Sequence, residues 1–85
     1  MTKDEIKPIV KKYLLEEFLQ GAGEDELQDD TELMSTGVLD SISTTRLVAF
    51  LEEQFGVTFD AHEMGVDHLN TLEQISDLIF AKKEA

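Results

Sequence analysis

Large apolar residues recur at helical spacing along this chain, and this period constrains the fold more than any other feature. The first stretch forms one stripe at i, i+3 and i+4, which predicts a helix of roughly 15 residues. Its members are Ile6, Ile9, Val10, Tyr13, Leu14 and Phe18. Thr2 and Glu5 have the spacing of a capping box, but Pro8 belongs to a residue type that prefers the first helical turn. We therefore expect the regular helix to begin nearer Ile6 than Thr2. The glycines Gly21 and Gly23 are expected to end it.

A second helix follows from the same period. It begins at Asp40 or Ser41, because either side chain can accept a hydrogen bond from the free N–H groups of a first turn. Gly56 is expected to end it. The residues predicted to face inward are Ile42, Leu47, Val48, Leu51 and Phe55.

The C-terminal third of the chain predicts one short and one long helical segment. A short extended piece at residues 57–59 leads to Asp60, which caps a brief helical turn that runs through Met64. Asn70 or Thr71 caps the last helix. Its inward residues are Leu72, Ile75, Leu78 and Ile79.

Residues 20–40 form a long, acidic connection between the first two helices. Loops of this length inside a compact domain are uncommon and tend to be functional. Large apolar residues occur in it without a clear period, so we expect the loop to be pinned to the core. The sequence thus predicts an all-α fold in a single domain, residues 1–85, with three main helices and one short helix.

Charge and composition exclude several functions. The chain has 7 Lys and Arg against 19 Asp and Glu, a formal net charge of −12, which excludes nucleic acids and anionic membrane surfaces as partners. It has no Cys, and therefore no disulfide framework, thiolate zinc site or thiol nucleophile. The longest apolar run, residues 47–51, is far too short for membrane insertion, and no signal peptide is visible. We expect an acidic, soluble, cytoplasmic protein with basic partners.

The side chains also argue against an enzyme and against a metal site. His62 and His68 are six positions apart, which is not the spacing of a metalloprotease helix. A calcium loop that began at Asp60 would need Glu at its twelfth position, where Thr71 stands. We expect both histidines to be surface residues, and we identify no catalytic residue.

Residues 33–42 carry the strongest functional signal. A Gly-containing loop delivers the Ser41 hydroxyl to a helix N-terminus, although capping alone is the ordinary role of an Asp–Ser pair. Free N–H groups and the positive end of the helix dipole favour a phosphate there. A phosphodiester on Ser41 would be well placed.

The chain resembles the acyl and peptidyl carrier proteins over nearly all of its length. The segments that carry the resemblance are residues 33–42, 47–56, 57–60 and 71–75. The resemblance implies a four-helix acyl-carrier-like bundle. It also implies that a phosphopantetheinyl transferase, using coenzyme A and Mg²⁺, attaches 4′-phosphopantetheine to Ser41 with support from Asp40. The thiol of that arm would carry an acyl or aminoacyl group as a thioester, and loading and transferring enzymes would be the partners.

The resemblance also identifies the second helix as the docking face. Glu52 and Glu53 would offer negative charge to basic partners, and Ile42 is either an apolar contact for them or a half-buried helix residue. Ser43 and Arg46 stand where fatty-acid carriers are commonly acidic, which is a departure from those carriers.

Three functions remain open at this point. The first is a carrier for a specialised pathway, aminoacyl or secondary-metabolite, which Arg46 and the lead-in at residues 37–40 favour. The second is the general carrier of fatty-acid synthesis. The third is an unmodified helical interaction module, against which Ser41 itself argues. The cargo is not legible in the sequence, and we expect a monomer because no heptad or large apolar stripe remains outside the core.

Overall fold

The computed structural model describes residues 2–19, 21, 23 and 26–84. Its helices are α1 (Lys3–Glu17), α2 (Ser41–Phe55), the 3₁₀ turn η2 (Ala61–Met64), α3 (Val66–Leu69) and α4 (Leu72–Glu84). The described residues contain no strand, so the predicted all-α bundle of three long helices is confirmed. The sequence pattern missed α3, since four residues are too few to show a helical period.

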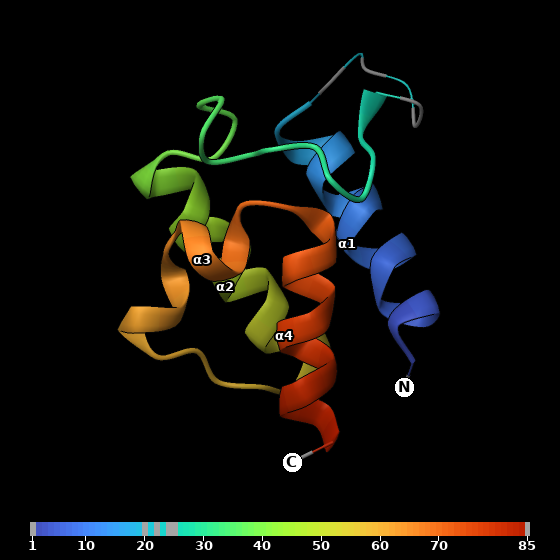
Figure 1. The fold of residues 1–85 in the computed structure, drawn as a ribbon, viewed down its shortest axis with the longest axis vertical. Helices are drawn as coiled ribbons and strands as arrows, with labels where there is room; N and C mark the ends of the chain where they lie inside the picture. Colours follow the sequence, from blue (N-terminus) through green and yellow to red (C-terminus); the bar gives the residue numbers. More distant parts are fainter. Residues whose placement is uncertain (1, 20, 22, 24–25, 85) are drawn as a thin grey trace.

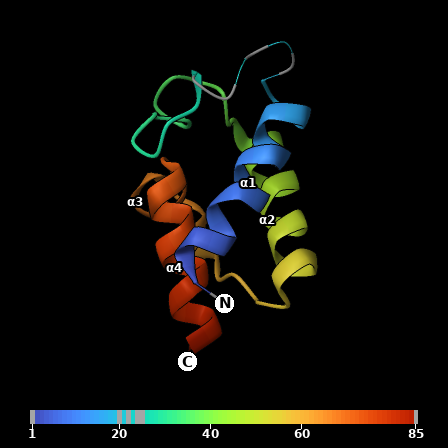
Figure 2. The ribbon, with the colours of Figure 1, turned by 90° about the vertical axis from the view of Figure 1, so that its right-hand side faces the viewer.

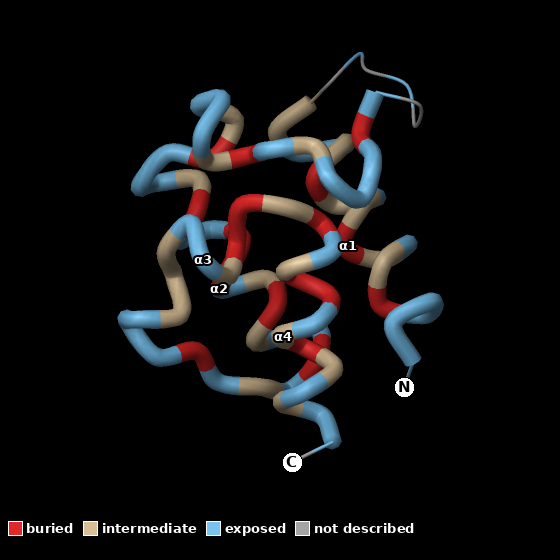
Figure 3. Tube along the Cα trace, in the orientation of Figure 1, coloured by how far each residue is buried: buried red, intermediate tan, exposed pale blue. Residues whose placement is uncertain are grey.

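The three long helices enclose the core, and α1 packs directly against α4 (Figures 1 and 2). Residues 26–40, the described part of the connection between α1 and α2, lie across one end of the bundle, and α1 begins and α4 ends toward the other. Buried positions occur on all four α-helices and on the connection between α1 and α2, but not on η2 (Figure 3). The core consists of Ile6, Val10, Leu14, Leu27, Leu33, Leu39, Leu47, Val48, Leu51, Phe55, Phe59, Leu69, Leu72, Ile75 and Ile79.

Helix α1 begins and ends earlier than its sequence predicts. It starts at Lys3, because the backbone N–H of Thr2 donates to Glu5 Oε1 at 3.0 Å and closes the capping box. Pro8 therefore lies inside the helix on its exposed side, where only one backbone hydrogen bond is lost. The last helical residue is Glu17, and the cap is Phe18 instead of a glycine.

Helix α2 begins and ends where the sequence indicates. Asp40 is its N-cap, Ser41 is its first residue, and Gly56 ends it in the left-handed conformation with φ 68°. Ile42, however, is 74% exposed, so its prediction as an inward residue is wrong. At 100° per residue it lies about 160° around the helix from Thr44, which takes the inward position instead.

The long connection is pinned to the core, as predicted. Leu27 and Leu33 are fully buried in it, and Leu39 is 2% exposed. Asn70, at the junction of α3 and α4, holds the same segment by three hydrogen bonds. Its backbone carbonyl accepts from the Leu33 N–H at 2.6 Å, and its side-chain oxygen accepts from the N–H groups of Met34 (2.8 Å) and Ser35 (3.0 Å).

The start of α4 is capped by Thr71, one of the two predicted candidates. The Thr71 hydroxyl oxygen accepts from the Gln74 N–H at 3.1 Å. This leaves the side-chain oxygen of Asn70 free to bind the connection.

Candidate functional site

Ser41 is exposed at the N-terminus of α2, directly after the pinned connection. The chain reaches it through a turn in which the Gly37 N–H donates to the Met34 carbonyl at 3.2 Å. Gly37 has φ 84°, a conformation that favours glycine. The Leu39 N–H then donates to the Leu33 carbonyl at 3.0 Å and closes the loop immediately before the serine.

Asp40 and Ser41 divide two roles between them. Asp40 Oδ1 accepts from the Ser43 N–H at 2.8 Å, and hydrogen bonds from Ser43 hold the pKa of this carboxyl below its usual range. Asp40 is therefore the cap, and its carboxylate is charged at neutral pH. The Ser41 hydroxyl has no partner among the residues that the structure describes, so it is free for chemistry.

A hollow of ≈360 Å³ lies beside Ser41. Its lining residues are Met34, Leu39, Asp40, Ser41, Thr44, Thr45 and Met64. Thr44 is only 6% exposed, and its hydroxyl oxygen lacks a hydrogen-bond partner within the described part of the chain. A buried hydroxyl without a hydrogen bond lowers the stability of the folded state by about 1–3 kcal/mol.

Of the four residues expected to dock partners, three lie on one face of α2 and the fourth, Glu52, lies beside that face. Ile42, Arg46 and Glu53 fall within about 40° of one another around α2 and are exposed together with Ala49; we call these four the outer stripe. Arg46 is held at one edge of the stripe, where its guanidinium lies 3.5 Å from Glu17 Oε2.

Glu52 lies to the side of the outer stripe and has a role inside the fold. Its Oε2 accepts from the Phe59 N–H at 2.9 Å, which ties α2 to the turn that follows it. Glu52 therefore has a structural role in the fold, and its role in docking stays a prediction.

One group of ionisable side chains has ligand spacing that the sequence pattern missed. The ligand atoms of Asp60, His62 and Glu63 lie within 4.8 Å of one another, and no sequence spacing typical of metal sites marks them. Glu63 Oε1 already accepts from the Asp60 N–H at 2.9 Å and from Lys82 Nζ at 2.7 Å. These two bonds hold the Glu63 pKa below its usual value. The group thus joins η2 to α4. His62 is exposed, as expected, whereas His68 is half-buried.

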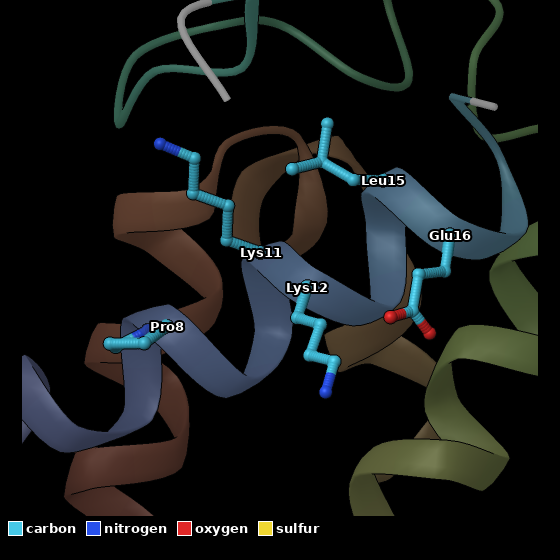
Figure 4. Close-up of a pocket in the computed structure, with 5 residues that line it drawn as sticks. All are labelled: Pro8, Lys11, Lys12, Leu15 and Glu16. Atoms are coloured by element: carbon cyan, nitrogen blue, oxygen red, sulfur yellow. The ribbon is translucent and has the colours of Figure 1, made fainter. Parts of the chain in front are cut away.

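A second hollow of ≈670 Å³ lies on α1 and shares no residue with the one at Ser41. Pro8, Lys11, Lys12, Leu15 and Glu16 line it, all from one helix. The two lysine side chains extend to opposite sides of α1, so they do not converge on one point (Figure 4). Among the helices described, none is long and apolar enough to cross a membrane.

Comparison with known proteins identifies the family of this chain. A family model described as "Phosphopantetheine attachment site" matches residues 12–79. The D-alanyl carrier protein of Streptococcus mutans is 33% identical over 81 residues, which cover 95% of this chain and 99% of that protein. The D-alanyl carrier protein of Lactobacillus delbrueckii subsp. bulgaricus is 30% identical, with coverage of 81% and 92%.

A solved structure shares the fold. One chain of the "Crystal structure of FAD-dependent dehydrogenase" is 31% identical to this chain, with a TM-score of 0.74 and coverage of 82% here and 97% there.

The site fits a phosphopantetheine group. The Ser41 hydroxyl is exposed at the start of a 15-residue helix and has no partner in the described part of the chain, so it offers an oxygen to which such a group can be attached. The free N–H groups of that first turn favour a phosphate. The adjacent hollow of ≈360 Å³ leaves room beside this oxygen.

Proposed function

This chain belongs to the phosphopantetheine-attachment family of carrier proteins, and from that premise we propose that Ser41 bears the arm and that the cargo is an aminoacyl group. The cofactor is covalent 4′-phosphopantetheine, whose terminal thiol holds an acyl or aminoacyl group as a thioester. The single observation that supports Ser41 is its exposed, unpaired hydroxyl at the N-terminus of α2, free because Asp40 supplies the cap.

The residues around Ser41 contribute position and charge. The Ser41 oxygen would form the bond to phosphorus while the phosphate–phosphate link of coenzyme A breaks. Adenosine 3′,5′-bisphosphate would leave, and the hydroxyl proton would pass to a base on the transferase. The N-terminal end of α2 stabilises the phosphate that results. Asp40, kept charged by its bonds to Ser43, is placed to serve the Mg²⁺ that the transferase uses. The chain itself acts as substrate and partner, not as an enzyme.

The nature of the cargo is supported by two observations. The curated relatives named above are D-alanyl carrier proteins. In addition, α2 has no acidic residue before Glu52, so most of the outer stripe offers little charge to the basic partners of fatty-acid carriers. We propose a D-alanyl or similar aminoacyl cargo. The alternative remains the general fatty-acid carrier, and the unmodified interaction module ranks third.

The partners follow from this function. They are a phosphopantetheinyl transferase, an enzyme that loads the amino acid and an enzyme that accepts it. We expect the protein to work as a monomer in the cytoplasm, with the outer stripe and Glu52 meeting these enzymes in turn.

Intact-mass spectrometry tests the attachment site. The unmodified protein, incubated with coenzyme A, Mg²⁺ and a broad-specificity phosphopantetheinyl transferase, should gain the mass of one phosphopantetheine. Ser41→Ala should gain none and keep its helical circular-dichroism signal, because Asp40 remains as the cap. Ser43→Ala is the matched control and should be modified like the wild type. Addition at Ser43 or Ser35 would show that the assignment is wrong.

A loading assay tests the cargo. The modified protein should accept D-alanine from a D-alanine-activating ligase and should be a poor acceptor for a malonyl transferase of fatty-acid synthesis. The reverse preference would favour the alternative function.

A further inference from the structure

Lys82, in the last turn of α4, contacts the chain that follows α2 at three points. Its Nζ donates to the Thr58 carbonyl at 2.7 Å and to Glu63 Oε1 at 2.7 Å, and it lies 5.1 Å from the centre of the Phe59 ring. Lysines near the C-terminus of a helix often bind the last carbonyls of that helix. Lys82 instead binds a different segment, which passes the end of α4 (Figure 1). Its contacts therefore hold α4 and this segment together.

The position of η2 depends on polar contacts more than on burial. η2 has no buried residue, and Met64 is only partly buried against the core. The capping box joins Asp60 to Glu63 and so holds η2 together internally. In the described part of the chain, the bond between Glu63 and Lys82 is the one that ties η2 to another helix. The two side chains are 13% and 17% exposed, so salt screens this ion pair less than a surface pair. Loss of Lys82 should therefore loosen η2.

The chain runs from η2 directly to the surface beside Ser41. Met64, the last residue of η2, lines the same hollow as Ser41. Val66, at the start of α3, is 47% exposed, and Ile42, next to Ser41, is 74% exposed. Among the residues that the structure describes, these two are the exposed large apolar side chains. An enzyme that reaches Ser41 thus meets one apolar side chain from α2 and one from α3, and the position of the second depends on η2.

We propose that Lys82 is a positioning residue for the phosphopantetheinyl transferase. It fixes η2 and the start of α3, and with them the surface over which the transferase approaches Ser41. This inference rests on the proposed function, since it needs the transferase to act on Ser41. Lys82 works at a distance from the serine, through its bonds to Glu63 and Thr58.

Hydrogen exchange of the unmodified protein tests whether Lys82 fixes η2. Lys82→Met keeps the apolar stem without the ammonium, so the amides of residues 61–69 should exchange faster than in the wild type. Lys82→Arg restores a cation and should restore most of the protection. Lys83→Met is the matched control, because the Lys83 Nζ donates to the Phe55 carbonyl at 2.9 Å, at the end of α2. It also removes one charge, but exchange at residues 61–69 should stay at the wild-type level.

The rate of modification tests whether this position matters to the transferase. The assay uses saturating coenzyme A and Mg²⁺, at a temperature at which circular dichroism shows every variant fully folded. The kcat/KM for the carrier should fall severalfold with Lys82→Met, stay near the wild-type value with Lys83→Met and largely recover with Lys82→Arg. Glu63→Gln keeps an oxygen for both hydrogen bonds without the ion pair, so it should change exchange and rate in the same direction by less. This variant decides the question if Lys82→Met does not fold.

A merely stabilising role for Lys82 gives a different pattern. Lys82→Met would then melt at a lower temperature but be modified at the wild-type rate, and the proposal would be overturned while the carrier function stands. Unchanged exchange at residues 61–69 would overturn it as well. If the wild type gains no phosphopantetheine, the proposed function fails, and this inference with it.

Discussion

At the scale of single residues, the site depends on two neighbours with separate tasks. Asp40 accepts from the Ser43 N–H and fixes the start of α2, and the Ser41 side chain bonds to none of the residues that the structure describes. The sequence alone did not decide which of these two residues is the N-cap, because both residue types cap helices well. Only the backbone decides: Asp40 has the extended conformation of an N-cap, and Ser41 is already helical.

The Asp40 cap should make stability depend on pH. Its hydrogen bonds lower the pKa of the carboxyl in the folded state, so this contribution is present above the unfolded pKa of about 3.9 and is lost as the pH falls through the folded value. We expect Asp40→Ala to melt below the wild type at pH 7, with the gap closing in acid. Melting curves from pH 7 to pH 2 measure it.

Asp40→Asn is the control for charge. It keeps an oxygen that can accept from Ser43 but does not titrate, so its melting temperature should lie between the other two at pH 7. A gap between Asp40→Ala and wild type that stays constant with pH would contradict a charged cap.

At the scale of elements, the sequence predicted the three long helices, but only some of their ends. The Gly56 end of α2 was predictable because glycine suits its left-handed conformation. The start of α1 was not, because the capping box at Thr2 and the preference of Pro8 point to different residues, and only the folded chain shows the box closed. Likewise, Ile42 is apolar but lies opposite the inward face of α2.

The two glutamates near the end of α2 should behave differently when reversed. Glu53 is exposed on the outer stripe, so Glu53→Lys should slow loading by a basic partner without lowering the melting temperature. Glu52 accepts the Phe59 N–H, so Glu52→Lys should slow loading and also lower the melting temperature. Loading rates at low and high salt, together with melting curves, separate these effects.

Glu52→Gln supplies the control, because its amide oxygen can keep the bond to Phe59 without the charge. It should melt close to the wild type. A melting temperature as low as that of Glu52→Lys would mean that the charge, and not the hydrogen bond, is what the turn needs.

At the scale of the whole molecule, charge opposes folding. With 19 acidic and 7 basic residues, the folded surface repels itself. The ion pairs Lys3–Asp77 (2.6 Å) and Lys7–Asp29 (2.8 Å) are partly exposed and contribute little each. The sign of the net charge could be predicted from the composition. The ion pairs could not, because they depend on which helices lie side by side.

Screening should therefore stabilise the protein. We expect its melting temperature at neutral pH to rise when NaCl is added to a low-salt buffer, and to rise at lower concentration with MgCl₂. Differential scanning fluorimetry measures both series. A melting temperature that stays flat across them would show that self-repulsion does not limit this fold.

The hydrogen bonds of Asn70 to the connection determine when, during synthesis and folding, Ser41 becomes ready for modification. Its side chain joins Met34 and Ser35 to a residue 36 and 35 positions further on, so the segment before Ser41 is fixed only when the two halves of the molecule have met. A nascent chain that ends before Asn70 has the serine but not the loop that presents it. Attachment of the arm is therefore expected to wait until synthesis has passed this residue, which makes folding itself the checkpoint for activation.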